Sequence, residues 1–456
     1  MPTIEPALST LDLTWVRSQF PSLAQIVNGH PAAFLDGPGG TQVPQRVIDA
    51  ISDYLRRDNS NTAGAYATGR RTDAMIAAAR AAMADFLRCG SDEVVFGQNM
   101  TSLTYMISRS IGRELRPGDE ILVTRLDHDA NVSPWLAMAE EKGVTVRWAE
   151  IHDEDCTLDI ADLASKINEK TKLVAVGYAS NAVGTINPVK VITKLAHAAG
   201  ALAFIDAVHY APHGLIDVAA LDCDFLVCST YKFFGPHMGV LYGKREHLQH
   251  LHPYKVRPLV DTVPFRWEWG TLNHECIAGI GACVDYIAEI GRRALESNET
   301  RVPHPSCISK GGNHNSEPGV PREGEEKNER RRAIEAAYEV THEHERALLD
   351  RLLAGMATIP NAKIYGITDP ARMNERCSTV AVRIEDGKPG RSPLELATKL
   401  GDRGFFTWDG NYYALNLTEH LGVEKTGGFL RIGLVHYNTV EEVDRFVAAL
   451  HEIVST

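Results

Sequence analysis

The chain has 456 residues and carries a net charge of −12, from 47 basic and 59 acidic side chains. This length exceeds what one compact core usually supports, so we expect two domains. The acidic balance argues against a nucleic-acid or anionic-membrane partner. No apolar run approaches the roughly 20 residues that a membrane span requires, and residues 1–20 lack a signal-type apolar core. We therefore expect a cytoplasmic protein.

The eight cysteines show no CxxC pair and no clustering typical of metal sites. We predict free, buried thiols and no metal site. His304, Cys307 and His314 share one polar segment, but their spacing is irregular and a metal site needs a fixed ligand geometry.

Short strands and helices alternate over the first part of the chain. A strand at 32–35 precedes Gly37-Pro38-Gly39-Gly40, which lacks the spacing of a phosphate-binding loop and predicts a tight turn. Helices at 41–57 and 72–87 and a strand at 93–96 follow. Thr101 and Ser102 then stand before the helical run 103–111. These two residues either bind a phosphate at the helix N-terminus or cap the helix.

Further apolar strands are predicted at 120–124, 144–148, 173–178, 201–205 and 225–227, with helices between most of them. The nearly continuous apolar run at 173–178 indicates a strand that is buried on both faces. The alternation predicts an α/β fold: a three-layer domain with a mostly parallel sheet. Open sheets of this kind bind ligands at the carboxyl ends of their strands. Polar residues follow the predicted strands at Thr101, His128, Asn181, Asp206 and Lys232.

Lys232 follows an apolar strand and precedes Phe233-Phe234-Gly235-Pro236. It is either a surface lysine at a strand end or a desolvated amine, and a desolvated amine forms Schiff bases with carbonyl compounds. The polar residues at the other strand ends favour the second interpretation. Asp206 stands 26 residues earlier, at the end of the preceding strand. A lysine for the aldehyde and a carboxylate for the pyridinium nitrogen are what pyridoxal 5′-phosphate (PLP) requires.

Other residues complete a predicted PLP site. His128 can stack on the cofactor ring, and Asn181 can donate a hydrogen bond to its phenolate oxygen. Arg431 can bind a substrate carboxylate with two hydrogen bonds. The predicted phosphate ligands are Thr101, Ser102 and Ser229.

The second part of the chain begins with a polar segment at 291–332, rich in charge, glycine and proline, which predicts a surface insertion or flexible connection. Helices at 333–353, 393–400 and 440–453, strands at 379–384 and 429–433, and a loop at 407–416 predict a smaller α+β domain. We therefore expect an N-terminal segment (1–30) that packs on the small domain, a large PLP-binding domain (31–290), the insertion (291–332) and the small C-terminal domain (333–456).

Several stretches, in this order along nearly the whole chain, carry a family resemblance. They include Asp127-His128-Asp129-Ala130-Asn131, Ser180-Asn181-Ala182-Val183-Gly184-Thr185, Phe204-Ile205-Asp206-Ala207-Val208-His209, Ser229-Thr230-Tyr231-Lys232 and Arg431-Ile432-Gly433-Leu434-Val435-His436. The chain resembles the class V aminotransferase family of fold-type I PLP enzymes, and within it the cysteine desulfurase-like branch.

The resemblance implies roles for these residues. It makes Lys232 the lysine that binds PLP, with Asp206, His128, Thr101 and Ser229 around the cofactor and with Asn181 and Arg431 on the substrate side. His209 stands where the family often has glutamine, near the phenolate oxygen. Trp269-Gly270-Thr271 resembles the segment that reaches the phosphate of the neighbouring subunit, so Thr271 implies a homodimer with shared active sites.

One loop departs from the family pattern. Members of the desulfurase-like branch carry a nucleophilic cysteine ahead of the Arg431-type strand, but here the matching loop is Trp408-Asp409-Gly410-Asn411-Tyr412-Tyr413-Ala414. Tyr413 takes the place of that cysteine, Trp408 that of an arginine, and no cysteine follows Cys377. A persulfide cannot form on this loop. Its aromatic side chains either pack internally or line the substrate pocket.

These observations predict a PLP-dependent C–S lyase that eliminates the β-substituent of a cysteine-like or otherwise β-substituted amino acid. An aminotransferase or an epimerase is the alternative, because both begin with the same proton abstraction. A non-catalytic PLP-binding regulatory subunit would not need Lys232 or Arg431. A nucleotide-binding module would need a phosphate loop that the chain lacks.

Overall fold

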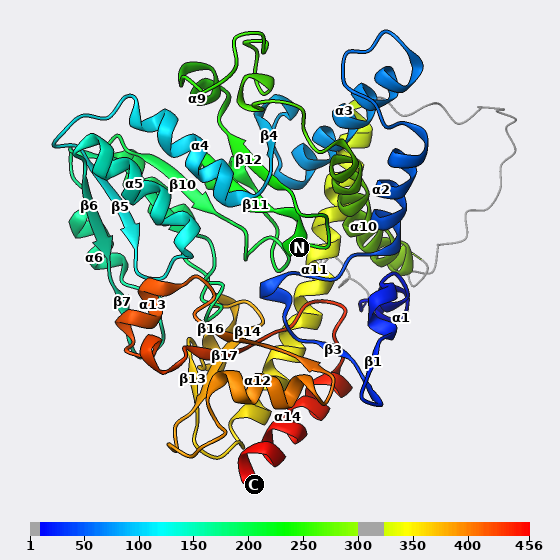
Figure 1. Ribbon diagram of the computed structural model, residues 1–456, viewed down its shortest axis with the longest axis vertical. Helices are drawn as coiled ribbons and strands as arrows, with labels where there is room; N and C mark the ends of the chain where they lie inside the picture. The colour runs from blue at the N-terminus through cyan, green and yellow to red at the C-terminus, as the bar shows by residue number, and fades with distance from the viewer. Residues whose placement is uncertain (1–9, 300–322) are drawn as a thin grey trace, which may run out of the picture.

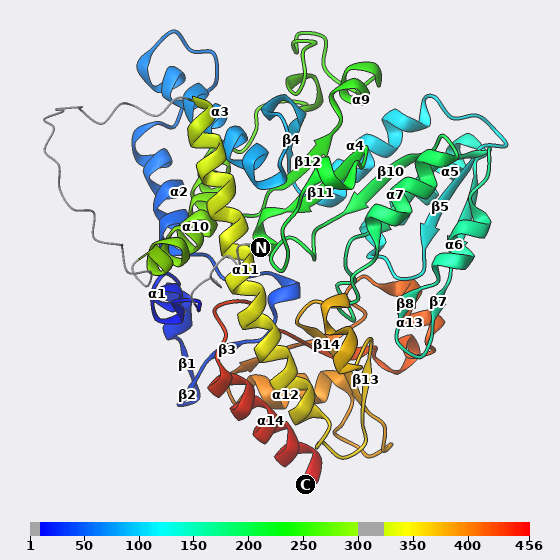
Figure 2. The same ribbon diagram turned by 180° about the vertical axis from the view of Figure 1, so that it is seen from behind.

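The computed structural model describes residues 10–299 and 323–456. Figures 1 and 2 show a larger part built around one sheet and a smaller part that contains the C-terminus. His304, Cys307 and His314 lie outside the described residues. No helix in the described ranges is both long enough and apolar enough to cross a membrane.

The large domain contains a seven-stranded sheet in the order β4-β12-β11-β10-β9-β5-β6. Its strands are parallel apart from β12, which runs antiparallel to both of its neighbours. The mostly parallel sheet predicted from the sequence is thereby confirmed. The strand bounds are β4 (Val94–Gly97), β5 (Glu120–Thr124), β6 (Thr145–Ala149), β9 (Thr171–Gly177), β10 (Leu202–Asp206), β11 (Phe225–Ser229) and β12 (Gly239–Gly243).

Each face of this sheet is buried under helices, because successive strand residues point to opposite faces. In β11, Phe225 and Val227 join one apolar core, while Leu226 and Cys228 join the other. The first core contains side chains of α4 (Met100–Gly112) and α5 (Ser133–Lys142). The second contains side chains of α3 (Ala67–Leu87), α7 (Val189–Ala198) and α10 (His274–Glu299). The predicted three layers are present.

The small domain has a four-stranded antiparallel sheet in the order β13-β14-β17-β16. The strands are β13 (Ala362–Tyr365), β14 (Thr379–Ile384), β16 (Trp408–Gly410) and β17 (Phe429–Gly433). Helices α12 (Pro393–Gly401) and α14 (Val440–Ser455) contribute to its own apolar core. The stretch 407–416, which we expected to be a loop, contains the edge strand β16 and the start of α13 (Leu415–His420).

Helix α11 (Glu323–Met356) runs along the large domain into the small one (Figure 2). The polar segment predicted at 291–332 is therefore helical at both of its described ends, since α10 continues to Glu299 and α11 begins at Glu323. Gly291 explains the close contact between these helices, because a Cβ at this position would lie 1.7 Å from the Ala333 carbonyl oxygen. The polar composition of residues 291–332 gave no indication that α10 and α11 pack against each other.

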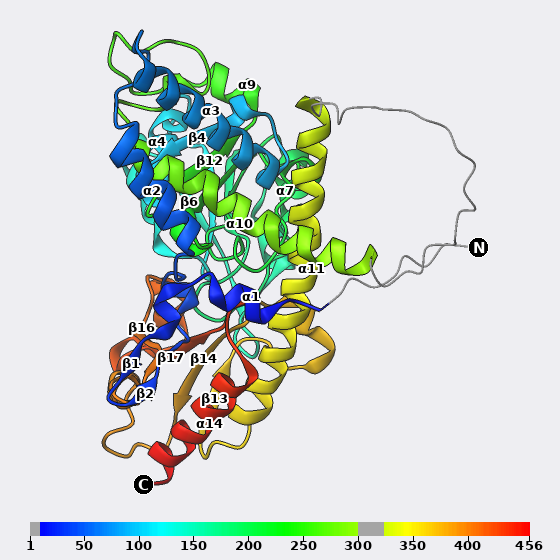
Figure 3. The ribbon, with the colours of Figure 1, turned by 90° about the vertical axis from the view of Figure 1, so that its right-hand side faces the viewer.

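The first described segment, residues 10–31, lies beside the small domain in Figure 3. This region contains α1 (Leu13–Ser18) and the hairpin β1 (Ile26–Val27) and β2 (His30–Pro31). Arg17 of α1 donates to the Tyr437 carbonyl at 2.7 Å and pairs with Glu442 at 2.9 Å. β3 (Ala33–Phe34) pairs with β15 (Phe405–Phe406), so the start of the chain joins the C-terminal domain.

A buried ion pair gives a test of how the large domain is held together. Arg80 donates to both oxygens of Glu268, at 2.8 and 3.0 Å, and the Phe96 N–H donates to the same carboxylate at 2.9 Å. Removing one partner of such a pair leaves an unpaired buried charge, which costs about 3–5 kcal/mol. We expect Glu268→Ala to lower the free energy of unfolding by about this amount in urea denaturation. Asp444→Ala, which breaks an exposed pair with Arg351, is the control, and equal losses in both variants would contradict the prediction.

Candidate active site

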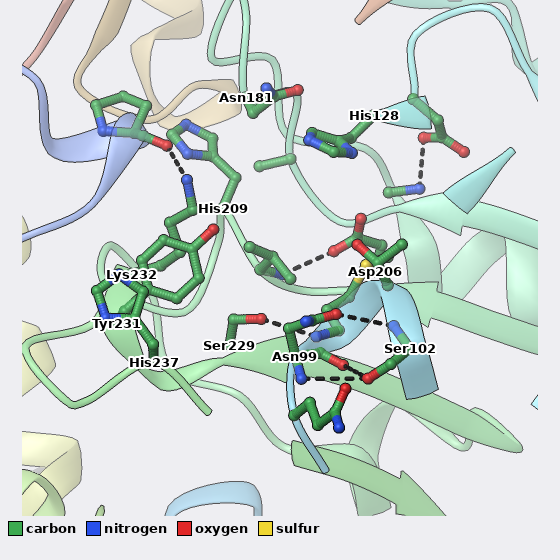
Figure 4. A pocket seen from close by; sticks show the side chains of 18 of the residues that line it. Asn99, Ser102, His128, Asn181, Asp206, His209, Ser229, Tyr231, Lys232 and His237 are labelled. Carbon is green, nitrogen blue, oxygen red and sulfur yellow. Dashed lines mark hydrogen bonds between the residues drawn. The ribbon is translucent and has the colours of Figure 1, made fainter. Parts of the chain in front are cut away.

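Polar side chains from the carboxyl ends of the strands converge on a cavity of about 650 Å³ (Figure 4). Asp206 is the last residue of β10, Ser229 is the last residue of β11, and Lys232 follows in a short 3₁₀ turn. His128 and Asn181 come from the loops after β5 and β9. The wall also includes Thr101, Ser102, His209, Tyr231 and His237. The structure therefore brings together most of the residues selected from the sequence.

Lys232 is the lysine that lines this cavity, and its surroundings shift its pKa strongly. Its Nζ donates to the Pro38 carbonyl and lies 4.9 Å from the Tyr231 ring centroid. Burial and, to a smaller extent, the positive charge of Arg431 lower the pKa of Lys232, the carboxylates of Asp206 and Asp36 oppose them, and the resulting pKa is about 7. At neutral pH, Lys232 therefore carries a neutral, nucleophilic amine in a substantial fraction of the molecules.

Asp206 is buried and accepts a hydrogen bond from the Val208 N–H at 2.9 Å. Burial raises the pKa of its carboxyl to about 6. A cation placed against this carboxylate would offset the desolvation that raises the pKa. Lys232 and Asp206 together suit a ligand with an aldehyde at one position and a protonated ring nitrogen at another, which fits PLP.

Two histidines that face the cavity are neutral. His128 accepts the Ala130 N–H at Nδ1 (3.0 Å), and burial lowers its pKa to about 4. His209 lies 3.1 Å from the Thr379 hydroxyl through Nε2, and burial lowers its pKa well below the usual range. Neither ring brings a positive charge toward Lys232. His128 therefore offers a neutral, flat face suited to stacking.

The predicted phosphate ligands behave differently from one another. Ser102 donates its hydroxyl to the Asn99 carbonyl and its N–H to Asn99 Oδ1, each at 2.9 Å, so it is the partner of the N-cap residue Asn99 in the capping box of α4. Ser229 accepts the Met100 N–H at 3.0 Å and keeps its own proton for donation. Thr101 is exposed at the first turn of α4. For Ser102 the structure shows the capping role that the sequence left open.

Thr271 does not line the cavity with Lys232. It lies with Trp269 in an adjoining cavity of about 400 Å³. Ser102 and His237 line both cavities. Within one chain, Thr271 therefore lies outside the cavity that contains Lys232. That Thr271 reaches the phosphate bound by a neighbouring subunit stays a prediction.

Arg431 of the small domain and Asn181 of the large domain meet at one side of the site. The Arg431 guanidinium donates to the Asn181 carbonyl at 2.8 Å and lies 4.0 Å from the Tyr412 ring centroid. The Asn181 amide donates to the Tyr412 carbonyl at 2.8 Å. Arg431 Nε and Asn181 Oδ1 are buried and lack partners among the described residues. Such unmet hydrogen-bonding capacity is expected where a ligand binds.

Sequence reasoning did not select Asp127, although it precedes His128 in a strand-end motif. Asp127 is buried and accepts hydrogen bonds from the Gly177 N–H at 2.7 Å and the Asn131 amide at 3.2 Å. Burial raises the pKa of its carboxyl well above the usual range. It fixes the loop that carries His128. Its position after an apolar strand was the available signal.

Comparison with known proteins agrees with this geometry. The family model for class V aminotransferases matches residues 33–305 and 333–446. The chain belongs to the class V aminotransferase family. Enzymes of this family depend on PLP, so the predicted enzyme class and cofactor are confirmed.

Among curated proteins, a cysteine desulfurase from Pectobacterium atrosepticum is 31% identical over 455 residues, which cover 96% of this chain and 97% of that protein. A cysteine desulfurase from Serratia proteamaculans is 32% identical over 454 residues, with the same coverage. The apo structure of a cysteine desulfurase from Thermococcus onnurineus superposes with a TM-score of 0.79 at 24% identity, covering 99% of this chain and all of that one. This likeness confirms the fold.

The pKa of Lys232 predicts how the apoprotein takes up PLP. Because the neutral amine is the nucleophile, we expect the uptake rate, followed by visible absorbance, to rise as the pH passes about 7 and to level off above it. Lys232→Ala should not show this dependence. A rise centred near the ordinary lysine pKa of about 10.4 would contradict the prediction.

Proposed function

We propose that the protein is a PLP-dependent lyase that removes the β-substituent of a cysteine-like or otherwise β-substituted amino acid. The observation that carries the proposal is the chemistry of the loop above Lys232. Tyr413 occupies it, and no cysteine lines either cavity that contains Lys232 among the described residues. The relatives named cysteine desulfurases support a sulfur-containing amino acid as the substrate class.

Among the described residues, no cysteine that could accept sulfur from a substrate lines the cavities at Lys232. The seven cysteines in the described ranges are buried or half-buried, and Cys377 is the last cysteine of the chain. Burial raises the pKa of Cys377, Cys228 and Cys283, so these thiols stay protonated. Because the thiolate is the nucleophile, these cysteines are inert toward a substrate sulfur atom.

Different side chains would bind the substrate and move its proton. Arg431 would bind the substrate carboxylate, aided by its unpartnered Nε, and Asn181 would orient the same group. Lys232 would take the Cα proton at Nζ, because its lowered pKa keeps the amine available as a base. PLP, when bound, withdraws electrons from Cα and thereby acidifies that proton.

Asp206, His128 and His209 would hold the cofactor. The Asp206 carboxylate would pair with its ring nitrogen, the His128 ring would stack on its face, and His209 would contact its phenolate oxygen. Thr101 and Ser229 would bind the phosphate at the start of α4, where the helix N-terminus favours an anion. Ser102 would act through the cap of that helix.

We also propose a homodimer with shared sites. Thr271 follows Trp269, whose side chain is 46% exposed, and Phe265 nearby is exposed to the same extent. Exposed aromatic surface of this kind is typical of protein interfaces. A second subunit would bring Thr271 to the phosphate end of its partner's cavity.

Product analysis tests the lyase assignment. Loss of a thiolate from Cβ yields 2-aminoacrylate, which water converts to pyruvate and ammonia. We expect the holoenzyme to release thiol and pyruvate in equal amounts from an S-substituted cysteine, while Lys232→Ala is colourless and inactive. Transfer of sulfur to the protein with release of alanine would contradict the proposal. So would a keto acid that retains its sulfur, which would indicate an aminotransferase.

A further inference from the structure

A second cavity, of about 1000 Å³, opens directly beyond Lys232. We call it the vestibule. It shares His128, Asn181, Tyr231 and Lys232 with the cofactor cavity, so a ligand at Lys232 extends into it. Its outer wall comes from the small domain and includes Trp408 and Tyr413. The proposed lyase does not by itself say what occupies this space.

Several aromatic residues of the wall are open to a ligand. The exposed fraction of the residue is 70% for Tyr413, 49% for Trp408 and 39% for Tyr105. Tyr231 also lines this cavity. Large aromatic side chains each bury about 150–250 Å² when covered. A flat apolar substituent would gain most from this wall.

The loop holds Tyr413 in place instead of letting it swing. Tyr412 and Tyr413 both have left-handed backbone angles, with φ of 56° and 61°. Each such non-glycine residue costs of order 1–3 kcal/mol. Hydrogen bonds from the Asn181 amide to the Tyr412 carbonyl (2.8 Å) and from the Asp129 N–H to the Tyr413 carbonyl (2.7 Å) hold this conformation.

In this loop conformation the Tyr413 ring stacks on the His128 ring. The Tyr413 ring lies 5.4 Å from the His128 ring, centroid to centroid, with an angle of 19° between the planes. His128 faces the cofactor cavity and Tyr413 faces the vestibule. The pair therefore continues an aromatic surface from the reacting centre outward.

The charged side chains of the vestibule wall limit which β-substituents of a substrate it can accept. Among the described residues of the vestibule wall, the basic side chains are Lys232 and Arg431, both shared with or next to the cofactor end. The outer part carries the carboxylates of Asp129, Asp409 and Glu424. An anionic substituent would meet like charge there, whereas a neutral or cationic ring would not.

We propose that the amino acid bound at Lys232 carries a flat aromatic β-substituent without negative charge, and that Tyr413 selects it by stacking. The inference rests on the proposed function in one respect, that the substituent leaves as a thiolate. In that step Lys232 takes the Cα proton, the Cβ–S bond breaks, and the sulfur keeps the electron pair. The sulfur is then protonated to give the aromatic thiol, and water converts the remaining 2-aminoacrylate to pyruvate and ammonia.

The test compares S-benzyl-, S-methyl- and S-carboxymethyl-L-cysteine with the holoenzyme. We expect kcat/KM to be about tenfold or more higher for the benzyl than for the methyl compound, and lowest for the carboxymethyl compound. Tyr413→Ala should lower the benzyl value about tenfold more than the methyl value. Tyr413→Phe should retain the benzyl value, because stacking needs the ring and not the hydroxyl.

Binding is measured separately through the shift in cofactor absorbance. L-Phenylalanine, which has no leaving group, should bind more tightly than L-alanine, and Tyr413→Ala should remove that difference. Tyr254→Ala, a change at an exposed tyrosine that lines neither cavity, is the control. If the binding preference holds but no thiol is released, the substituent class stands and the lyase assignment fails. Equal binding of both amino acids, or equal losses for benzyl and methyl substrates in Tyr413→Ala, would overturn the inference.

Discussion

The desolvation of the Lys232 ammonium is the constraint on which the site depends. Arg431 lies in the same buried region, and burial also lowers the pKa of its guanidinium, to about 10. Two positive charges held out of water disfavour each other. Of the carboxylates that balance them, Asp206 is buried and Asp36 is half-buried, and desolvation raises the pKa of both to about 6. The less basic cation yields its proton, so Lys232 becomes the reactive amine and Arg431 keeps its charge for a carboxylate.

This electrostatic arrangement requires both domains. Lys232 and Asp206 come from the large sheet, whereas Arg431 lies on β17 of the small one. The Arg431 bond to the Asn181 carbonyl and the Asn181 bond to the Tyr412 carbonyl connect the two at the site. The site therefore forms only where the two domains pack together.

The large sheet and its polar edge were predictable because each strand is a short apolar run that ends at a polar residue. Asp206 and Lys232 follow this rule, and parallel strands bring such ends together. The extent of α11 was not predictable, since its contact with α10 depends on the missing side chain of Gly291. The sequence left two roles open for Ser102, phosphate binding and helix capping, because a helix N-terminus offers the same atoms to a phosphate and to its own cap.

We propose that the loop above Lys232 gives this chain a reaction outcome different from that of the cysteine desulfurases it resembles. Its left-handed tyrosines are held by backbone hydrogen bonds, so the loop presents a wall where a thiol carrier would need freedom to move. The aromatic character was visible in the sequence, but the direction of Tyr413 was not, because it follows from backbone angles that tyrosine rarely adopts. In this proposal Lys232 and Asp206 determine the cofactor, whereas the Tyr413 loop determines the reaction outcome.

Borohydride reduction of the holoenzyme followed by peptide mass mapping tests the central claim most directly. If Lys232 is the desolvated amine that binds PLP, the phosphopyridoxyl group will be found on the peptide that contains Lys232. Attachment to another lysine, or an unmodified Lys232 peptide from protein saturated with PLP, would contradict the account.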